Sequence, residues 1–472
     1  MTATRTLAIL AALLAAADPA AAQAERYELG RRLRAYEAAW ELAEPGARVK
    51  SYAGLPKVTG QFFGLQLGEA GRTLDEARYV LTGDEASATV AWAESLFLDP
   101  EARLIDAAKP GLAVAVKSLY AVKGGPTEGA TCRVTLGGGT PVVADFAKLP
   151  AKLTMPLPKV PDGGADLPLT LEVLAGGVVL SRCGVTVSVV PDLAAKLAAL
   201  GRAAKAEPST VEAATLRDRV EQLKQLAGGA TLDTDVPAAK LLAEAEAIAK
   251  LPAGTPHFTP ARAGQFRLSV PVAAGGGKFT TAPLRSLVPD TLDAAKPVPL
   301  VVALHGAGGS EDLFFEGYGA GRIVAECEKR GWLLVAPRGG LFGAPPVEEI
   351  VAALATRYPI DPKRVFLVGH SMGAGQAAEL VQRSPGKYRG LGLLGGAARV
   401  RDAKAFADLP LFLAVGTKDP LALAGMRALN KTLTAAGAKR LTYREYPEAE
   451  HLVIVRESLP DLFAQWDALK AD

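Results

Sequence analysis

The sequence predicts an α/β protein with a mostly parallel β-sheet in its C-terminal part, preceded by a β-rich, sandwich-like region and a helical segment. Residues 265–472 alternate short apolar runs with amphipathic stretches at helical spacing, which is typical of parallel strands covered by helices on both faces. Residues 58–190 instead hold short β-like runs separated by Gly and Pro clusters. Residues 191–252 are rich in Ala, Leu, Glu, Lys and Arg at helical spacing.

The first 22 residues predict a signal peptide. Arg5 supplies a short basic region, Leu7–Ala17 is an apolar run, and the small residues that follow offer a cleavage site near Ala22. The alternative is a buried N-terminal helix. No other stretch approaches the roughly 18 consecutive apolar residues of a membrane span. We therefore expect a soluble protein that is exported to the periplasm or the extracellular space.

The bulk composition describes an ordinary globular protein. The 472 residues carry a formal net charge of +3, with 49% hydrophobic and 22% charged residues, and this length indicates two or three domains. No dense basic patch with interleaved aromatic residues is present, so nucleic acid is not expected as a partner. Cys and His residues do not show the spacing of a metal site, and we expect neither a metal nor another cofactor.

Upstream of the predicted sheet, the chain divides into four segments. These are an N-terminal helical segment at 23–57, a β-rich accessory domain at 58–190, a helical connector at 191–252 and a Pro-punctuated linker at 253–264. Pro45-Gly46 ends the first helix, and residues 82–97 look helical within the β-rich domain. We expect a structural or docking appendage, with contact to a polysaccharide or a protein through the β-rich domain as the alternative.

The three cysteines suggest no nucleophile. Export permits disulfides, and Cys132 and Cys183 lie in β-like segments of one region, so a bond between them and two free thiols are both open. Cys327 lies in the helical segment AECEKRGW and is expected to act as a small buried hydrophobe.

The C-terminal part has a regular order of elements. Strands are predicted at 300–304, 333–336, 365–368, 390–394, 411–415 and 441–446, and helices after 304 to about 330 and at 347–358, 372–383 and 459–469. Ligands of such sheets bind at the carboxyl ends of the strands, and the motifs described next all follow strands.

The segment Gly369-His370-Ser371-Met372-Gly373 matches G-x-S-x-G. It directly follows the apolar strand VFLV and opens the helix AGQAAELV, and this context predicts a sharp turn that exposes the Ser371 hydroxyl above the sheet. Gly369 and Gly373 let the strand and helix backbones approach closely. The side chain of His370 should point away from the hydroxyl.

A serine nucleophile needs a base beside it, and the chain has four histidines. His257 lies in the linker, His305 follows the first strand of the sheet and is expected to shape that loop, and His370 adjoins the serine. His451 follows the last strand, in a loop from which it can reach Ser371. We therefore predict His451 as the general base.

The acid that orients the base is predicted to be Asp419. It follows the strand LFLAV in the segment GTKDP, and its place between Ser371 and His451 gives the chain order Ser…Asp…His. An Asp before Pro can also simply start a turn. The alternatives are Asp402 and Asp408, which precede that strand, and Glu448 and Glu450 beside the histidine.

A tetrahedral intermediate needs N–H donors for its oxyanion. The backbone N–H of Met372 is one predicted donor, and the Gly-rich loop His305–Gly309 supplies the second, with Ala307 favoured over Gly308. Such a loop could also cradle a phosphate, but no G-K-[ST] follows it, so the hydrolase interpretation explains it better.

Residues of about 265–472 resemble the α/β-hydrolase superfamily, near dienelactone hydrolases, polyhydroxybutyrate depolymerases and feruloyl esterases, with similarity to the catalytic domains of prolyl-oligopeptidase-type peptidases. The segments LHGAGGSED, GHSMGAGQA, VGTKDP and EHLVIV carry the resemblance. It implies a C-terminal α/β-hydrolase domain at 265–472. Little chain lies between residues 394 and 411, where many lipases insert a lid, which argues against an interfacial lipase.

These observations predict an exported serine hydrolase that cleaves small-molecule or polymer-linked carboxylic esters through an acyl-enzyme on Ser371. The first alternative is a prolyl-oligopeptidase-like serine peptidase. The second is a non-catalytic binding protein with an inactive hydrolase domain.

Overall fold

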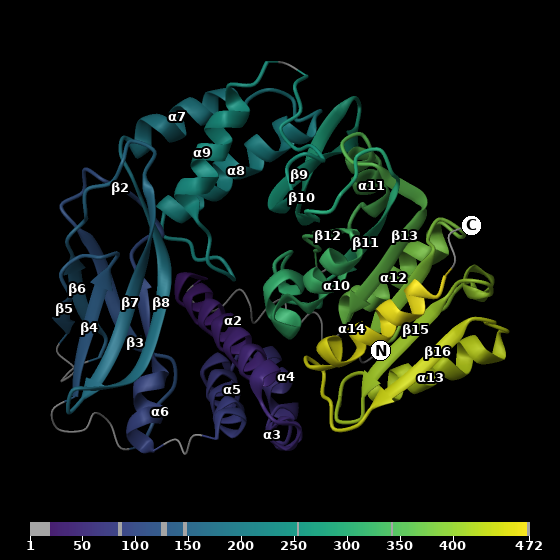
Figure 1. Cartoon of the computed structure of the whole chain (residues 1–472), viewed down its shortest axis with the longest axis horizontal. Coiled ribbons are helices and arrows are strands. Elements are labelled where there is room, and N and C mark those ends of the chain that lie inside the picture. Colours follow the sequence, from purple (N-terminus) through teal and green to yellow (C-terminus); the bar gives the residue numbers. More distant parts are fainter. Residues whose placement is uncertain are drawn as a thin grey trace. The chain divides into compact units, whose positions relative to one another are not determined.

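The computed structural model describes residues 19–83, 87–123, 130–144, 149–252, 254–340 and 343–469. Most of the predicted signal peptide, residues 1–18, lies outside this range. The chain forms two compact units (Figure 1). Unit 1 comprises the residues up to Lys205 together with Arg219–Lys250, and unit 2 comprises Ala206–Asp218 together with Leu251–Asp472.

Unit 1 begins with helices that extend much further than predicted. They are α2 (Pro19–Leu42), α3 (Pro45–Ser51), α4 (Pro56–Phe63), α5 (Leu67–Thr82) and α6 (Ala88–Ser95). The expected start of the β-rich region at residue 58 is therefore wrong, because strands begin only at Leu96. The glycines of α5 explain the error: a Cβ on Gly68 would lie 2.4 Å from the Leu119 carbonyl oxygen, and one on Gly71 would lie 2.5 Å from the Leu119 side chain. They mark close packing of a helix and not turns between strands.

The β-rich region is a sandwich of two sheets, as predicted. Its strands are β1 (Leu96–Pro100), β2 (Leu104–Asp106), β3 (Leu112–Ser118), β4 (Ala130–Leu136), β5 (Val142–Ala144), β6 (Ala151–Met155), β7 (Ala165–Ala175) and β8 (Val178–Val190). One sheet has the order β1-β3-β6 and the other β2-β8-β7-β4-β5. Alternate residues such as Val114 and Val116 of one sheet and Leu169 and Leu171 of the other point into one shared core.

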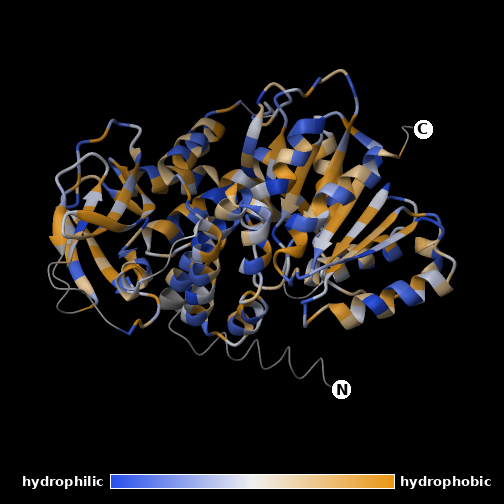
Figure 2. Ribbon diagram, turned by 60° about the horizontal axis from the view of Figure 1, so that its bottom comes forward, coloured by the Kyte–Doolittle hydropathy of each residue, from blue (hydrophilic) through white to orange (hydrophobic). Residues whose placement is uncertain are grey.

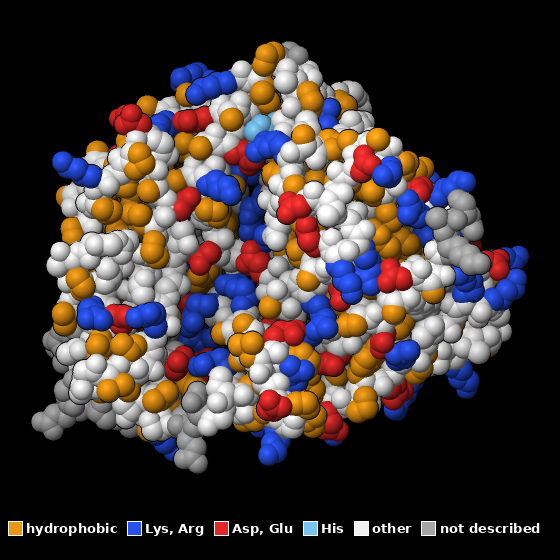
Figure 3. All heavy atoms as spheres, in the orientation of Figure 1, with side chains coloured by type: hydrophobic (Ala, Val, Ile, Leu, Met, Phe, Trp, Pro, Cys, Tyr) orange, Lys and Arg blue, Asp and Glu red, His pale blue; other side chains and the backbone are white. Residues whose placement is uncertain are grey.

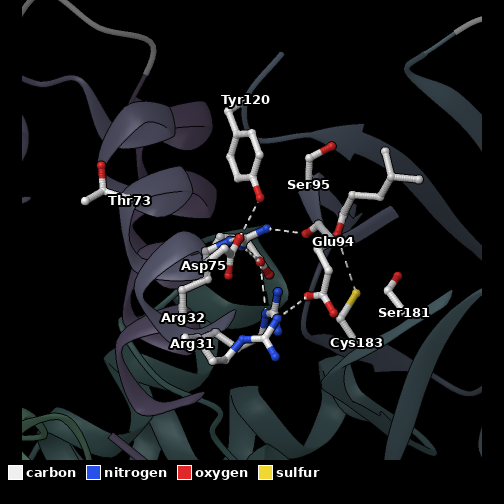
Figure 4. A network of polar contacts seen from close by, with 12 residues as sticks. Arg31, Arg32, Thr73, Asp75, Glu94, Ser95, Tyr120, Ser181 and Cys183 are labelled. Atoms are coloured by element: carbon white, nitrogen blue, oxygen red, sulfur yellow. Dashed lines mark hydrogen bonds and ion pairs between the residues drawn. The ribbon is translucent and has the colours of Figure 1, made fainter. Parts of the chain in front are cut away.

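A buried network of charges holds the helices of unit 1 on the sandwich (Figure 4). The Arg32 guanidinium of α2 donates to the Asp75 carboxylate of α5 at 2.8 Å and to the backbone carbonyl of Glu94 in α6 at 2.7 Å. The Tyr120 hydroxyl, just after β3, donates to the same Asp75 oxygen at 2.7 Å. Because each buried charge has a partner of opposite sign, burial is tolerated here, and the network specifies how helices and strands pack.

Cys132 and Cys183 are both free thiols. They lie on β4 and β8, which flank β7 on opposite sides, since Cys132 is in register with Val173 and Cys183 with Leu171. Two strand spacings separate them by about 9–10 Å, whereas a disulfide requires Cα atoms within about 7 Å. Of the two alternatives, the structure therefore has the free thiols.

This geometry predicts the outcome of a thiol count. Alkylation of the unfolded protein without reductant should add one group to each of Cys132, Cys183 and Cys327, as read by intact mass. Two thiols that react only after reduction would contradict the arrangement of β4, β7 and β8.

The connector forms α7 (Leu193–Ala203), α8 (Val211–Ala227) and α9 (Ala238–Ala249). As predicted, a break at Gly228 follows α8 and Pro237 precedes α9. The first part of α8 belongs to unit 2.

Unit 2 contains an eight-stranded sheet of order β16-β15-β14-β13-β11-β12-β10-β9. Its strands are β9 (Gly264–Gly275), β10 (Lys278–Val288), β11 (Val298–Leu304), β12 (Leu333–Pro337), β13 (Ile360–His370), β14 (Gly390–Leu394), β15 (Leu411–Gly416) and β16 (Leu441–Tyr446). The six strands β11 to β16 run parallel, while β10 is antiparallel to both β12 and β9. This is the α/β-hydrolase fold, as predicted; the β9–β10 hairpin was not predicted from the sequence.

Helices cover both faces of this sheet (Figure 1). They are α10 (Arg322–Arg330), α11 (Val347–Ala355), α12 (Met372–Arg383), α13 (Leu423–Ala435) and α14 (Ile454–Asp467), of which α13 was not predicted. Helices α10 and α14 share a core with Val301 and Ala303 of β11. Val302 and Leu304 alternate with Val301 and Ala303 along β11, so they point to the other face of the sheet, and they are equally buried. Right-handed crossovers place α11, α12 and α13 on this other face. In Figure 2 the central strands are accordingly hydrophobic throughout, while the helices carry both kinds of residue.

A residue from the predicted connector hydrogen-bonds the backbone of the edge strand β9. The Thr215 hydroxyl of α8 accepts the Ser269 N–H at 2.9 Å and lies 3.2 Å from the carbonyl oxygen of the same residue, to which it donates. Asp218 accepts from the Thr281 hydroxyl of β10 at 2.7 Å. Residues 206–218 therefore complete unit 2, which does not begin at residue 265.

Basic and acidic side chains lie interspersed over unit 2 on the face shown in Figure 3. Several form ion pairs, among them Arg427 with Glu445 at 2.7 Å and Arg330 with Asp467 at 2.6 Å. Among the residues that the structure describes, no helix combines the length and the apolar character of a membrane span.

Candidate active site

Ser371 sits in a strained turn between β13 and α12. Its backbone angles are φ 54° and ψ −117°, a region that a residue with a side chain rarely adopts. The turn is held by the Ser371 N–H, which donates to the Leu394 carbonyl at the end of β14 at 3.0 Å. Strain of this kind persists only where the surrounding structure imposes it, and it is typical of functional sites.

The two flanking glycines make this turn sterically feasible. A Cβ on Gly369 would lie 2.1 Å from the Gly373 carbonyl oxygen, and a Cβ on Gly373 would lie 2.1 Å from the Leu304 carbonyl oxygen at the end of β11. Neither position has room for any side chain. The close approach inferred from the sequence is thus a contact between backbones at both glycines.

Ser371, His451 and Asp419 form one hydrogen-bonded chain at the carboxyl edge of the sheet. The Ser371 hydroxyl oxygen lies 2.9 Å from His451 Nε2, and His451 Nδ1 lies 2.9 Å from one Asp419 carboxylate oxygen. The other Asp419 oxygen accepts the N–H groups of Leu421 and Ala422, both at 2.9 Å. Because the carboxylate only accepts, the proton of the imidazole belongs on Nδ1, and Nε2 is free to accept from the serine.

The other carboxylates considered for Asp419's position lie elsewhere. Asp402 caps the short helix η3 (Ala403–Phe406) through the Lys404 N–H, and Asp408 forms an exposed ion pair with Lys439 at 3.0 Å. Glu448 is exposed and lies 3.7 Å from Lys418. The remaining candidate, Glu450, is buried but accepts backbone N–H groups of its own loop.

The other three histidines are engaged in different contacts. His257 contacts Arg262 in the segment before β9. His305 Nε2 accepts the Gly339 N–H at 2.9 Å, so its Nδ1 donates to the Gly306 carbonyl at 2.8 Å and shapes the loop, as expected. His370 points away from the Ser371 hydroxyl and contacts Tyr318 and the backbone of His451.

The Gly-rich loop after β11 packs directly beside the nucleophile turn. A Cβ on Gly306 would lie 3.3 Å from Ser371 Cβ. Next in the loop, Ala307 is half-buried and Gly308 is exposed. Met372 begins α12, where backbone N–H groups have no partner within the helix. The predicted donors Met372, Ala307 and Gly308 belong to the helix start and to the loop that contacts the Ser371 turn.

Sequence reasoning missed Tyr318 and undervalued Glu450. Tyr318 is buried beside His370, but nothing in its sequence surroundings distinguishes it from a core aromatic residue. Glu450 is fully buried; one of its carboxylate oxygens accepts the Leu452 and Val453 N–H groups at 2.8 and 2.9 Å, and no hydrogen-bond partner for the other is found among the described residues. It thus fixes the loop that carries His451.

Burial, the largest cause, raises the pKa of the Glu450 carboxyl from 4.5 to about 7. Between pH 4.5 and 7 the folded protein keeps a proton that the unfolded chain has lost, so this group's contribution to stability falls as pH rises through that window. Glu450→Gln removes the titration and keeps an oxygen for the two N–H groups. Its free energy of unfolding relative to wild type should grow by on the order of 3 kcal/mol between pH 4.5 and pH 8.

Urea unfolding at the two pH values measures this change, with Glu448→Gln in the same loop as the matched control. Because Glu448 is exposed, its variant should show no such growth. If the difference in unfolding free energy between Glu450→Gln and wild type were the same at both pH values, this would contradict a raised pKa of the Glu450 carboxyl.

Comparisons with known proteins show similarity in fold. No family model matches the chain, and no curated protein matches it. The solved structures similar to it include the feruloyl esterase module of Clostridium thermocellum (15% identity, 47% of this chain and 94% of that one, TM-score 0.38) and a ferulic acid esterase of Anaeromyces mucronatus (17% identity, 46% and 93%, TM-score 0.36). A thermostable esterase is similar over 79% of this chain and 99% of its own (14% identity, TM-score 0.39). At these identities the similarity concerns the fold alone.

Proposed function

We propose that this protein is a serine hydrolase that cleaves carboxylic esters through an acyl-enzyme on Ser371. The observation that carries the proposal is the chain of 2.9 Å contacts from the Ser371 hydroxyl through His451 to the buried Asp419. The strained turn that presents Ser371 and the Gly-rich loop beside it support the same chemistry. In this proposal the three residues are a catalytic triad.

Acylation follows from the geometry. The Ser371 oxygen forms a bond to the ester carbonyl carbon while its proton passes to His451 Nε2. The carbonyl oxygen becomes an oxyanion, which the N–H of Met372 and an N–H of the loop at Ala307 or Gly308 would stabilise. His451 then gives its proton to the departing alcohol as the bond between carbonyl carbon and alcohol oxygen breaks. Asp419 stabilises the imidazolium throughout and keeps the proton on Nδ1.

Deacylation repeats these steps with water. His451 Nε2 takes a proton from a water molecule whose oxygen attacks the acyl carbonyl carbon. The second tetrahedral intermediate uses the same backbone donors. Its collapse breaks the bond to the Ser371 oxygen, returns the proton from His451 to that oxygen and releases a carboxylic acid.

An ester is proposed over an amide because of the demands that the leaving group makes. An amine leaves only when it is fully protonated, and peptidases usually add an extended cleft to position the chain. Within unit 2, β14 and β15 are joined by a short loop that contains only the helix η3. This connection adds no large insertion of the kind that could extend a cleft beside the site. Export of the protein stays a prediction from the first 22 residues.

A matched pair of substrates tests the proposal: a p-nitrophenyl ester and a p-nitroanilide with the same acyl group, for acyl chains of increasing length. We expect turnover of the short esters, none of the anilides, and covalent labelling by a fluorophosphonate. Comparable kcat/KM for ester and anilide would make the protein a peptidase. A purified protein that neither turns over any ester nor becomes labelled would contradict the hydrolase proposal.

A further inference from the structure

Tyr318 and His370 form a second buried hydrogen-bonded chain beside the triad, which the proposed mechanism does not use. The Tyr318 hydroxyl oxygen lies 2.6 Å from His370 Nδ1, and His370 Nε2 lies 2.8 Å from the backbone carbonyl oxygen of His451. At the other end, the Gly306 N–H donates to the Tyr318 hydroxyl at 3.4 Å, the longest of the three contacts. Both side chains are 2% exposed.

With a neutral imidazole at His370, only one placement of the protons makes all three contacts hydrogen bonds. The backbone N–H of Gly306 can only donate, and the carbonyl of His451 can only accept. The Tyr318 oxygen therefore accepts from Gly306 and gives its single proton to His370 Nδ1, which leaves the imidazole proton on Nε2 to bond the carbonyl. Burial, followed by the nearby His451, holds the pKa of His370 well below its usual value, in agreement with this placement.

A neutral His370 suits a reaction in which His451 becomes positively charged. The two imidazole rings are 4.8 Å apart between centroids. A second positive charge at that distance, out of contact with water, would oppose the imidazolium that His451 forms during acyl transfer.

This hydrogen-bonded chain joins three segments of the site that lie at the ends of three different strands. Gly306 belongs to the loop after β11, His370 precedes Ser371 at the end of β13, and His451 lies in the loop after β16. A relative shift of these loops of about 1 Å would misplace a base or a donor, and such errors can cost about 100-fold in rate. The buried side chains of Tyr318 and His370 connect these three segments through hydrogen bonds.

The backbone that presents Tyr318 is itself strained. It follows the π-helical turn η1 (Leu313–Gly317), and the next three residues, Gly319, Ala320 and Gly321, all have positive φ. For Ala320 the left-handed conformation costs roughly 1–2 kcal/mol. A Cβ on Gly321 would lie 2.3 Å from the Phe315 carbonyl oxygen, so the two backbone segments approach closely and no side chain fits at this position.

We propose that Tyr318 and His370 are positioning residues, which hold the oxyanion loop at Gly306 and the base loop at His451 in register with Ser371. The inference rests on the proposed serine hydrolase function. It assigns the second residue of the G-x-S-x-G motif a role of its own.

The test compares kcat and KM for a short p-nitrophenyl ester. Tyr318→Phe removes one hydroxyl and should lower kcat roughly tenfold, with KM within about twofold because no substrate contact is lost. His370→Phe removes both contacts and should lower kcat about 100-fold. His370→Gln can still donate to the His451 carbonyl and should recover most of that loss. The double variant Tyr318→Phe with His370→Phe should be no slower than His370→Phe alone, because both changes break the same chain.

Tyr358→Phe is the matched control, since the Tyr358 hydroxyl is buried in unit 2 and no hydrogen-bond partner for it is found among the described residues. It should keep the wild-type kcat. Three results would overturn the inference: a Tyr318→Phe variant with the kcat of this control, a double variant that loses the product of the two single effects, or losses that vanish once the folded fraction is corrected for. A wild type without fluorophosphonate labelling would instead contradict the proposed function itself, and the positioning role with it.

Discussion

Ser371→Ala is expected to lower kcat for a short p-nitrophenyl ester by at least about 10⁴-fold and to abolish covalent labelling by a fluorophosphonate. The variant lacks the hydroxyl oxygen on which the proposed mechanism forms the acyl-enzyme, while the surrounding backbone stays in place. Alanine meets the same backbone strain at φ 54°, so the folded protein should keep its thermal midpoint. KM should change little, because the serine hydroxyl contributes to bond formation and not to substrate binding.

The control for this experiment is Ser384→Ala, at the opposite end of the same helix, α12. Ser384 contacts Glu348 and no member of the triad, so its variant should be labelled as the wild type is. Persistent labelling or turnover in Ser371→Ala would place the nucleophile elsewhere in the chain.

Asp419→Asn is expected to lower kcat on the order of 10⁴-fold, although it changes a single atom. One side-chain position, facing the N–H groups of Leu421 and Ala422, must remain an oxygen, so the new NH₂ group faces His451 Nδ1. Nδ1 must then accept, the imidazole proton moves to Nε2, and Nε2 can no longer accept from the Ser371 hydroxyl. The nucleophile loses its base while the geometry is preserved.

The rate of fluorophosphonate labelling and kcat for the ester measure this effect together. Asp408→Asn serves as the control, because Asp408 is exposed and paired with Lys439. If Asp419→Asn retains its rate, the triad has a different acid, and Glu450 becomes the residue to test.

The sequence predicted unit 2 well because its signals are local. A parallel strand buried on both faces needs a continuous apolar run, as in β15, and a sharp turn after a strand needs glycines at fixed positions, as around Ser371. Asp419 and His451 could be inferred because the carboxyl ends of parallel strands meet at one edge. These patterns require no knowledge of distant partners.

Besides the β9–β10 hairpin and α13, the missed features depend on partners far away in the sequence. Arg32 and Asp75 are polar residues that a pattern assigns to the surface, and their burial makes sense only once Tyr120 is placed against them. The glycines of α5 look like turn residues until Leu119 packs on them. Tyr318 needs the fold to bring it to His370, 52 residues further along the chain.

The contact of Thr215 with the edge strand β9 also constrains how this protein could have arisen. Residues 206–218 complete unit 2, while residues 219–250 return to unit 1 before the chain enters unit 2 for the second time. No single crossover between two genes could therefore exchange one unit and leave the other whole. Replacing unit 1 while keeping unit 2 would require exchanging two separate segments, residues 1–205 and 219–250.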